Sequence, residues 1–324
     1  MKTQLIYERN YHKAATIIKE GGLVGFRTET VYGLGADATN ADAVGKIFTA
    51  KGRPSDNPLI VHFYSIGHLE QYFTLDTQTK LILSSIKKSL TIILPFPNDS
   101  KISRAVLGTE SRSIAVRIPS CKFTRKFIQS ANTPIAAPSA NTSTRPSPTR
   151  WQDVYADLDG KINAVIMGRQ TQIGLESTVI KVIEGEIKIL RHGGITPEYI
   201  SKKTGLNVTY ADNIQVLKES PGTRHKHYAP SVPLFTSDCH TKTLSYIKDK
   251  NAVILCRNQN KNLYFNAKVI TLGNDGKCVG KNLYKALRES EKVAEVAIIE
   301  SMPQTSEFAT INERIRKASQ GNCI

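Results

Sequence analysis

The residues best suited to chemistry are cations and hydroxyl or amide donors that lie in short Pro-rich and Gly-rich stretches. The stretch AKGRPSDNPLIVH places Arg53 directly before Pro54 and Lys51 two residues before Arg53. A residue before proline favours extended backbone, so the two cations are predicted to point to one side. Two cations placed in this way form a phosphate clamp, although a solvated basic loop is the simpler interpretation of this stretch taken alone.

Neutral donors gather in two further stretches. AAPSANTSTRPSPT holds Ser139, Asn141 and Ser147 among prolines, and GLESTV places Ser177 at the start of an apolar strand. In SIAVRIP, Arg117 stands inside an apolar strand, where a buried guanidinium needs an anionic partner from the protein or from a ligand. Because no Ser/His/Asp nucleophile set is evident, these donors favour phosphoryl or nucleotidyl transfer by positioning and charge stabilisation.

Three weaker motifs are considered and set aside. YGLGADA resembles the dinucleotide fingerprint, but Lys51 and Arg53 stand where its ribose-binding acid belongs, so only NADP would be tolerated. GKCVGKN does not have the P-loop spacing. His225 and His227 could share one face, but no third metal ligand lies near them. We therefore expect no organic cofactor and no metal held by protein side chains.

Composition limits the class of partner. The chain has 324 residues and a formal net charge of +16, which favours phosphorylated or polyanionic partners. Its five cysteines include no Cys-x-x-Cys pair and are expected to be free thiols of a reducing compartment. The apolar runs are too short to cross a bilayer and the N-terminus lacks a secretory pattern, so a soluble, cytoplasmic protein without membrane contact is expected.

The elements that must position these residues alternate between helix and strand. In the first part of the chain, apolar spacing predicts helices at 12–20, 41–50, 79–88 and 122–130, and strands at 23–26, 59–63, 90–94, 113–118 and 135–137. Residues 27–40 are predicted to be a loop, and a hairpin is predicted around Glu184 and Gly185. This mixture predicts an open, twisted, mixed α/β sheet that ends at about residue 208.

A second α/β pattern follows a basic connector. Its predicted elements are strands at 251–256 and 293–300 and helices at 280–292 and 311–319. The expected organisation is a catalytic domain at 1–208, a linker at 209–232 and a smaller, Rossmann-like α/β domain at 233–324.

Several motifs, taken in order, carry a resemblance to a known family. They are TETVYGLGADA, KGRPSDNPLIVH, VRIP, APSANTS, SPT, GLESTV, LRHGGIT and SPGTRHKHYAP. Together they resemble the threonylcarbamoyl-adenylate synthases, in the long form with a YrdC-like N-terminal domain and an added C-terminal domain. The resemblance implies synthesis of threonylcarbamoyl-AMP from L-threonine, bicarbonate or CO2 and ATP, with release of diphosphate. This is the first step of threonylcarbamoyl-adenosine formation in tRNAs that read codons beginning with A.

The same resemblance assigns residues to the two substrates. Lys51 and Arg53 are expected to be catalytic and to hold the ATP phosphates. The other residues expected at the ATP site are Asn57, Ser113, Ser139, Asn141, Ser147, Arg191 and Tyr228. Those expected around L-threonine are Thr30, His62, Arg117, Ala137 and Ser177, with Arg117 pairing the carboxylate. Mg2+ is expected to arrive with ATP, and a downstream threonylcarbamoyl-transferase machinery is the expected partner.

The connector SPGTRHKHYAP is predicted to act as a lid. By resemblance, Tyr228 reaches the nucleotide, and closure excludes water from a labile intermediate. The chain departs from the family pattern at Arg27, at residues 87–89, at Thr144 and at His192, which leaves the local geometry of those loops open.

Two other functions stay open on the sequence. One is a basic module that grips tRNA or double-stranded RNA without catalysis. The other is a carbamoyltransferase-type accessory enzyme that uses the same fold on another acceptor. Clustered neutral donors favour a small ligand over RNA, and dependence on threonine would separate the second alternative.

Overall fold

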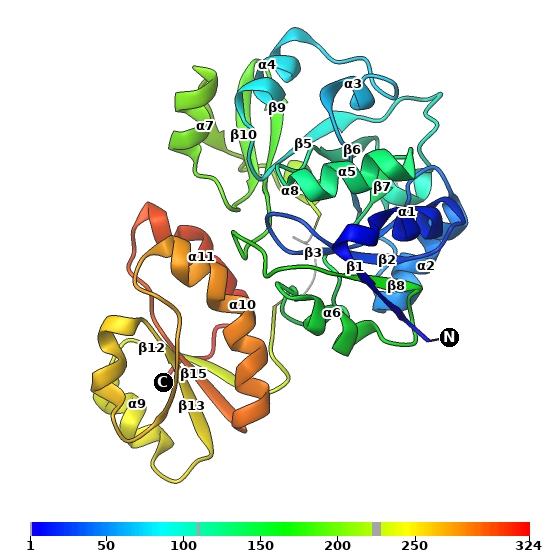
Figure 1. Ribbon diagram of the computed structural model, residues 1–324. Coiled ribbons are helices and arrows are strands. Elements are labelled where there is room, and N and C mark those ends of the chain that lie inside the picture. Colours follow the sequence, from blue (N-terminus) through cyan, green and yellow to red (C-terminus); the bar gives the residue numbers. More distant parts are fainter. Residues whose placement is uncertain (1, 109–110, 222–227) are drawn as a thin grey trace.

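The structure is a computed structural model that describes residues 2–108, 111–221 and 228–324. These residues form a large N-terminal sheet and a small C-terminal sheet, both flanked by helices (Figure 1). The large sheet has 11 strands in the order β1-β8-β2-β3-β7-β4-β6-β5-β9-β10-β11, and the small one has four in the order β12-β15-β13-β14. The expected fold class, an open mixed sheet followed by a smaller α/β unit, is therefore confirmed.

The strands of the large sheet have the following bounds: β1 Gln4–Tyr7, β2 Val24–Arg27, β3 Tyr32–Asp37, β4 Ile60–His62, β5 Leu90–Pro95, β6 Ser113–Arg117, β7 Ile135–Ala136, β8 Ala164–Met167, β9 Thr178–Ile183, β10 Glu186–Arg191 and β11 Val208–Tyr210. Pairs such as β4 with β6 are parallel, whereas β2 with β3 and β5 with β6 are antiparallel. The β9–β10 hairpin turns at Glu184 and Gly185, which both have positive φ, as a type I′ turn requires.

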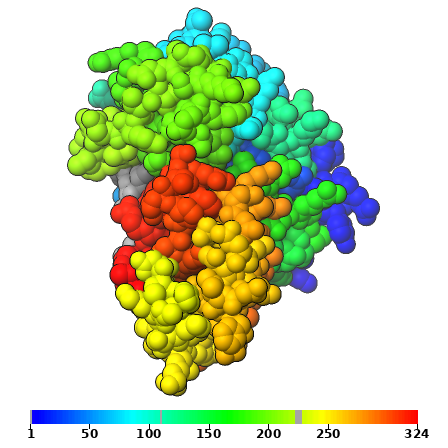
Figure 2. All heavy atoms as spheres, turned by 90° about the vertical axis from the view of Figure 1, so that its left-hand side faces the viewer, coloured from blue at the N-terminus to red at the C-terminus, as the bar shows by residue number. Residues whose placement is uncertain are grey.

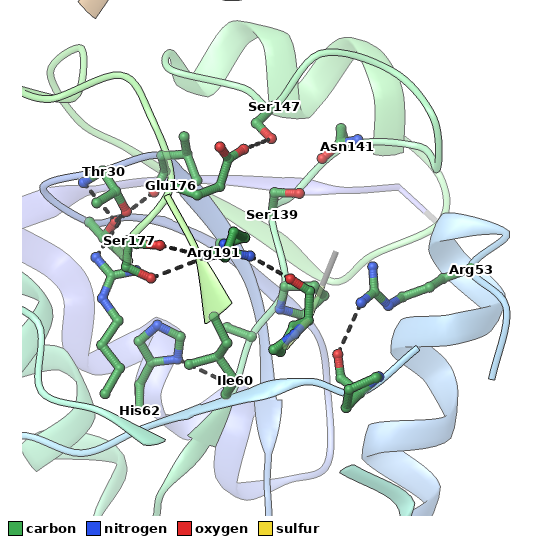
Figure 3. Close-up of a pocket in the computed structure, with 18 of the residues that line it drawn as sticks. Thr30, Arg53, Ile60, His62, Ser139, Asn141, Ser147, Glu176, Ser177 and Arg191 are labelled. Atoms are coloured by element: carbon green, nitrogen blue, oxygen red, sulfur yellow. Dashed lines mark hydrogen bonds between the residues drawn. The ribbon is translucent and has the colours of Figure 1, made fainter. Parts of the chain in front are cut away.

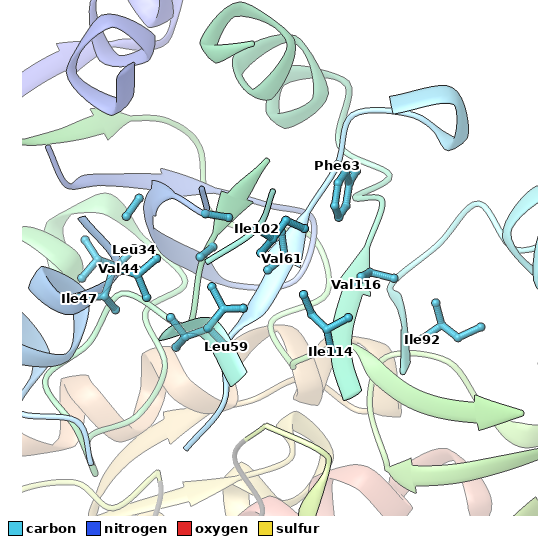
Figure 4. Close-up of a cluster of buried hydrophobic side chains, with 14 of the residues drawn as sticks. Leu34, Val44, Ile47, Leu59, Val61, Phe63, Ile92, Ile102, Ile114 and Val116 are labelled. Atoms are coloured by element: carbon cyan, nitrogen blue, oxygen red, sulfur yellow. The ribbon is translucent and has the colours of Figure 1, made fainter. Parts of the chain in front are cut away.

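Helices cover both faces of the large sheet. They are α1 Tyr11–Lys19, α2 Ala41–Lys51, α3 Ile66–Leu69, α4 Thr77–Ser85, α5 Lys122–Ala131, α6 Trp151–Leu158, α7 Pro197–Thr204 and α8 Ile214–Lys218. Ile18 of α1 and Phe127 of α5 pack with Phe26 in one buried cluster, and Val44 and Ile47 of α2 belong to another. Figure 4 shows this second cluster running from α2 across several strands.

The helix α2 brings two of the sequence-predicted cations to the sheet. Asn40 caps its start, because the side-chain oxygen accepts a hydrogen bond from the Ala43 amide at 3.0 Å. Its end is set by Gly52, whose φ of 59° ends the helix in the left-handed conformation. Lys51 is therefore the last helical residue, and Arg53 lies beyond the end of the helix.

The prediction of a loop at 27–40 is wrong in its middle, because Tyr32–Asp37 form β3, an interior strand of the large sheet. The Gly-rich sequence YGLGADA is explained by packing and not by a phosphate. A Cβ at Gly35 would lie 2.7 Å from the Phe26 ring and 2.8 Å from an Ile135 methyl group. Glycine is thus required where the strand passes under bulky neighbours.

The small sheet is entirely parallel. Its strands are β12 Leu234–Ser237, β13 Ala252–Cys256, β14 Lys268–Thr271 and β15 Val296–Glu300. The helices of the same part of the chain are α9 His240–Ile247, α10 Gly276–Val293 and α11 Ala309–Ser319. The predicted boundary at residue 280 is wrong, because α10 begins at Gly276, where the Asp275 side chain caps it by accepting from the Cys278 amide. The predicted strand at 293–300 is correspondingly shorter, since α10 extends to Val293.

Helices α10 and α11 lie between the small sheet and the N-terminal part (Figure 1). Figure 2 shows their orange and red residues in close contact with the green residues of the N-terminal part. The approach is tight at Gly174, where a Cβ would lie 2.5 Å from the Gly280 carbonyl oxygen. The remaining elements are the 3-10 helices η1 Glu8–Asn10, η2 Arg104–Leu107, η3 Asn258–Tyr264 and η4 Ser306–Phe308.

Candidate active site

A pocket opens where the ends of β3, β4, β6 and β10 meet the loops before and after them. Most of the sequence-predicted site residues line it: Thr30, Arg53, His62, Arg117, Ala137, Ser139, Asn141, Ser147, Ser177, Arg191 and Tyr228. In Figure 3, Ser147 and Glu176 lie on one side of the pocket, His62 and Ile60 on the opposite side, and Arg191 between them. Segments far apart in the chain thus supply one polar cavity.

The buried ammonium of Lys51 does not line this pocket. Its Nζ donates hydrogen bonds to the carbonyl oxygens of Ser139 and Asn141, both at 2.5 Å. Burial, together with the nearby charge of Arg53, holds the pKa of Lys51 well below its usual value. Lys51 therefore connects residues 138–149, which we call the donor-rich loop, to the end of α2.

Arg53 lines the pocket from the other side of the α2 terminus. Its Nη2 donates to the Pro58 carbonyl at 3.0 Å and its Nε to the Asn57 carbonyl at 3.3 Å. Burial, and after it the charge of Arg191, lowers the pKa of Arg53 to about 10, so the guanidinium stays charged at neutral pH. The structure thus separates the two cations that the sequence grouped together.

Asn57 and Ser113 also lie outside the residues that line the pocket. Asn57 is buried, and its backbone carbonyl supports Arg53. The Ser113 hydroxyl donates to Glu219 at 2.6 Å, and Glu219 also pairs with Lys181 at 2.7 Å. Ser113 therefore contacts the segment that leads into the connector.

Arg117 has an anionic partner within the protein. Its Nη2 donates to Glu29 at 2.6 Å and to the Thr30 hydroxyl at 2.9 Å, and both charged side chains are buried. Sequence reasoning missed Glu29, although a buried arginine demands an acid and TET supplies one beside Thr30. This ion pair fixes the guanidinium at the edge of the pocket.

His62 forms the floor of the same side. Its Nδ1 lies 3.2 Å from the Ile60 carbonyl, so the tautomer with a proton on Nδ1 donates to that oxygen (Figure 3). Burial and the Arg117 charge lower the pKa of His62 to about 3. The imidazole is therefore neutral at physiological pH.

Arg191 joins the end of β10 to two other segments. Its Nη2 donates to the Ser177 carbonyl at 2.9 Å and its Nη1 to the Pro221 carbonyl at 2.6 Å. The Ser177 hydroxyl in turn lies 2.7 Å from the Thr91 hydroxyl. These contacts hold Ser177 and the start of the connector against the pocket.

Four buried polar atoms of pocket-lining residues have no hydrogen-bond partner among the described residues. They are Arg117 Nε, Asn141 Oδ1, Arg145 Nε and Arg191 Nε. A buried polar atom without a partner costs about 1–3 kcal/mol, and arginine donors cost more. A polar, anionic ligand in this pocket would supply the missing partners.

The pocket also contains an acid and a cation that sequence reasoning did not assign. Glu176 accepts a hydrogen bond from the Ser147 hydroxyl at 2.7 Å (Figure 3). Arg145 pairs with Glu291 of α10 while lining the pocket. Both lie inside quoted motifs, but their partners come from distant parts of the chain, so local sequence gave no signal for them.

Tyr228 closes the pocket from the connector. It has a φ of 72° and stacks on Tyr284 of α10, with ring centroids 5.3 Å apart. Burial raises the pKa of Tyr228 to about 12. The central connector residues 222–227, including His225 and His227, lie outside the described residues, so the predicted lid is not described beyond Tyr228.

The described part of the chain offers no cluster of three or more His, Cys, Asp or Glu side chains suited to a metal ion. All five cysteines are described and are free thiols, as expected. In the same ranges, no helix has both the length and the apolar character needed to pass through a bilayer.

The fold and the pocket define a class of two-part α/β proteins that hold a small polar ligand at the end of an open mixed sheet. Residues 16–193 match a family model described as telomere recombination (Sua5/YciO/YrdC). Residues 195–320 match the C-terminal domain of threonylcarbamoyl-AMP synthase. The chain belongs to the threonylcarbamoyl-AMP synthase family, in its two-domain form.

Individual relatives match over nearly their whole length. The threonylcarbamoyl-AMP synthase of Bacillus subtilis is 37% identical over 325 residues, covering 96% of this chain and 93% of that protein. The threonylcarbamoyl-AMP synthase of Pyrococcus abyssi is 35% identical over 318 residues, covering 94% of this chain and 93% of that protein. The solved structure of Pyrococcus abyssi Sua5 complexed with L-threonine superposes with a TM-score of 0.87 at 33% identity, covering 100% of this chain and 99% of that one.

Proposed function

We propose that this protein joins L-threonine, bicarbonate or CO2 and ATP into L-threonylcarbamoyl-AMP with release of diphosphate. Family membership over both parts of the chain supports the activity. The observation that carries the assignment to this pocket is its set of unpaired buried donors on Arg117 and Arg191. Two substrates that bear a carboxylate and phosphates match those donors in charge and in hydrogen-bonding capacity.

The pocket is divided between the substrates by the position of its cations. On the side of Thr30, His62 and Arg117, the Arg117 Nε is available for the threonine carboxylate. Ala137 and Ser177 complete this side. A neutral His62 leaves Arg117 as the charge that orients the amino acid. The bound Pyrococcus abyssi structure supports a threonine site in this fold.

On the nucleotide side, the guanidinium groups of Arg53 and Arg191 line the cavity. Ser139, Asn141, Ser147 and Tyr228 line the same side, and Lys51 positions the loop that carries the first two. Ser113 and Asn57 support this site from outside the cavity. The preorganised charges would stabilise the negative charge that develops on the phosphates.

The reaction follows from these positions. The threonine amine adds to CO2 and loses a proton, forming a carbamate. A carbamate oxygen attacks the α-phosphorus of ATP, the bond to the bridging oxygen breaks, and diphosphate leaves. Because a free carbamate is labile, enclosure beneath Tyr228 would protect it from water.

Mg2+ would have to arrive with ATP. Among the described residues, Glu176 is the one acidic side chain that lines the pocket, and it is already engaged by Ser147 and Arg314. The residues present therefore do not fit a metal site built by the protein, and no step above runs through the ion. The expected consumer of the product is a transferase that moves the threonylcarbamoyl group to tRNA in the cytoplasm.

We also propose that residues 1–208 form the catalytic domain, that 209–232 form a linker which contains the connector SPGTRHKHYAP, and that 233–324 form the accessory domain. The large sheet ends at Tyr210 and the small sheet begins at Leu234, which supports this division. The net charge of +16 leaves direct contact with tRNA as a secondary candidate.

The test is an assay of purified protein with ATP, Mg2+, bicarbonate and labelled L-threonine. Threonine-dependent diphosphate release and the adenylate, detected by mass spectrometry, are the expected results. Arg53→Ala should reduce kcat about 100-fold, because one preorganised charge on the phosphates is lost. L-Serine in place of threonine is the substrate control. Folded protein that binds RNA but forms no adenylate would contradict the proposal and favour the RNA-binding module.

A further inference from the structure

The carboxylate of Glu176 joins the pocket to the C-terminal helices. Its Oε1 accepts a hydrogen bond from the Ser147 hydroxyl at 2.7 Å, and both residues line the pocket (Figure 3). Its Oε2 accepts from the Tyr284 hydroxyl at 2.9 Å and from Arg314 Nε at 3.1 Å. Tyr284 belongs to α10 and Arg314 to α11, so the two oxygens serve different parts of the chain.

Arg314 and Tyr284 are themselves held rigidly, and both are fully buried. Arg314 Nη2 donates to the carbonyl of His192 at 2.8 Å, and His192 is the residue that follows Arg191 in the chain. The Arg314 guanidinium lies 5.1 Å from the Tyr228 ring centre, and Tyr284 stacks on the same ring, with centroids 5.3 Å apart. Two residues of the C-terminal helices therefore contact two pocket-lining side chains, Glu176 and Tyr228.

The charge on Glu176 determines what Ser147 can offer a ligand. A buried carboxylate needs a partner of opposite charge, and Arg314 supplies it. Burial alone would raise the pKa of Glu176, but the charges of Arg314 and Arg191 and the Ser147 hydrogen bond together lower it. An ionised carboxylate can only accept hydrogen bonds, so Ser147 must donate to it. The lone pairs of the Ser147 oxygen are then left to accept from a ligand.

We propose that Arg314 and Tyr284 are positioning residues of the active site, which hold Glu176 so that Ser147 presents an acceptor to a hydroxyl or amino group of the nucleotide. This inference rests on the proposed function and adds a defined role for the C-terminal helices. The domain that carries them completes the nucleotide side of the pocket, in addition to docking against it.

The variant Tyr284→Phe removes one hydroxyl and keeps the ring that stacks on Tyr228. The Tyr284 hydroxyl is one of two donors to the Glu176 Oε2, so its loss should loosen the carboxylate that orients Ser147 and raise the KM for ATP by up to about tenfold. The kcat and the KM for L-threonine should change less than about twofold, because the lost contact acts on nucleotide binding. Calorimetric titration with ATP alone measures the same effect without turnover.

A second pair of variants separates positioning from folding. Arg314→Met leaves the Glu176 carboxylate buried without its cation, so both the Tm and the ATP affinity should fall. Adding Glu176→Gln removes the stranded charge and should restore the Tm. The KM for ATP should stay raised, because a glutamine amide can donate to Ser147 and reverse the direction of that hydrogen bond.

The matched control is Glu289→Gln, also in α10. Glu289 pairs with Arg150 across the same interface at 2.8 Å but does not line the pocket. This variant should keep the wild-type Tm, since partly exposed ion pairs contribute little to stability. Both KM values should stay within about twofold of those of the wild type.

The inference is overturned if Tyr284→Phe keeps the wild-type KM for ATP, or if the double variant regains both the Tm and that KM. Either result would mean that Arg314 and Tyr284 only dock the two parts together. Wild-type protein that forms no threonine-dependent adenylate would overturn the proposed function instead. The calorimetric ATP affinities of the variants would still decide the positioning role.

Discussion

The ammonium of Lys51 bridges two backbone carbonyls of the Ser139–Asn141 loop and does not face the cavity. A buried cation placed there organises a loop whose side chains line the pocket. At the residue scale, several charged groups behave in the same way. Arg117 is held by Glu29 and Arg191 by Ser177 and Pro221, yet each keeps one buried nitrogen unpaired among the described residues. Such groups are rigid and still able to bind a ligand.

The depressed pKa of His62 gives a prediction about stability and pH. Its folded pKa is about 3, whereas an unfolded histidine titrates near 6.5. Between these values the unfolded chain binds a proton that the folded chain does not, so stability is lost as the pH falls from about 6.5 toward 3. The His62→Gln variant should lack this contribution, and its free energy of unfolding should fall less than that of the wild type.

The measurement is urea unfolding of both proteins at pH 7 and pH 5. The wild type should lose up to about 2 kcal/mol more than the variant over this interval, because each pKa unit corresponds to about 1.4 kcal/mol. All other titrating groups are shared, so they cancel in the comparison. Equal losses in the two proteins would show that His62 titrates normally in the fold.

At the element scale, the strand β3 decides the geometry of the pocket. It pairs with β2 and β7, and it brings Gly33 to the pocket lining next to Thr30 and Val31. At Gly35 the strand passes close to Phe26 and Ile135, and glycine leaves the space that these side chains fill. Its Gly-rich sequence would otherwise disfavour a strand.

Two glycine substitutions test this explanation. Gly35→Ala should reduce the free energy of unfolding by about 1–3 kcal/mol, because its Cβ would lie within 3 Å of two core side chains. Gly45→Ala in α2 should instead raise it by about 0.5–1 kcal/mol, since no atom lies within 4 Å and alanine favours helix. Denaturant unfolding of both variants provides the comparison. A neutral Gly35→Ala would rule out crowding as the reason for glycine in β3.

At the scale of the whole molecule, buried ion pairs connect the two parts of the chain. Arg288 of α10 donates to Asp157 at 3.0 and 2.8 Å and to the Pro146 carbonyl at 3.0 and 2.6 Å. Pro146 lies directly before Ser147, so this contact also supports the pocket from behind. The C-terminal part therefore holds the donor-rich loop at two places, through Arg288 and through the Arg314–Glu176 pair.

The variant Arg288→Met should reduce the free energy of unfolding by about 3–5 kcal/mol, because it leaves Asp157 buried without its main cation. Unfolding in denaturant measures this loss, and limited proteolysis at the connector reports whether the two parts separate. Glu289→Gln, on the same helix, should cost no more than about 1 kcal/mol. Similar losses in both variants would mean that burial does not distinguish the two interface pairs.

Sequence reasoning predicted the α/β class, the two-sheet organisation and most residues that line the pocket. The helices with clear apolar spacing, such as α2 and α5, and the β9–β10 hairpin lie close to their predicted positions. These features depend on local periodicity, turn chemistry and motif order, which are written along the chain. The family and its activity follow from the same ordered motifs.

Only the tertiary structure decided which residues meet. Arg117 and Glu29 are 88 positions apart, and Arg314 and Glu176 are 138 apart, so no local pattern could pair them. The same applies to Lys51, which the sequence placed beside Arg53 but which the fold directs to distant carbonyls. The burial of a charge depends on the packing of the whole chain, and that burial determines its partner, its pKa and the ligand atoms it can still bind.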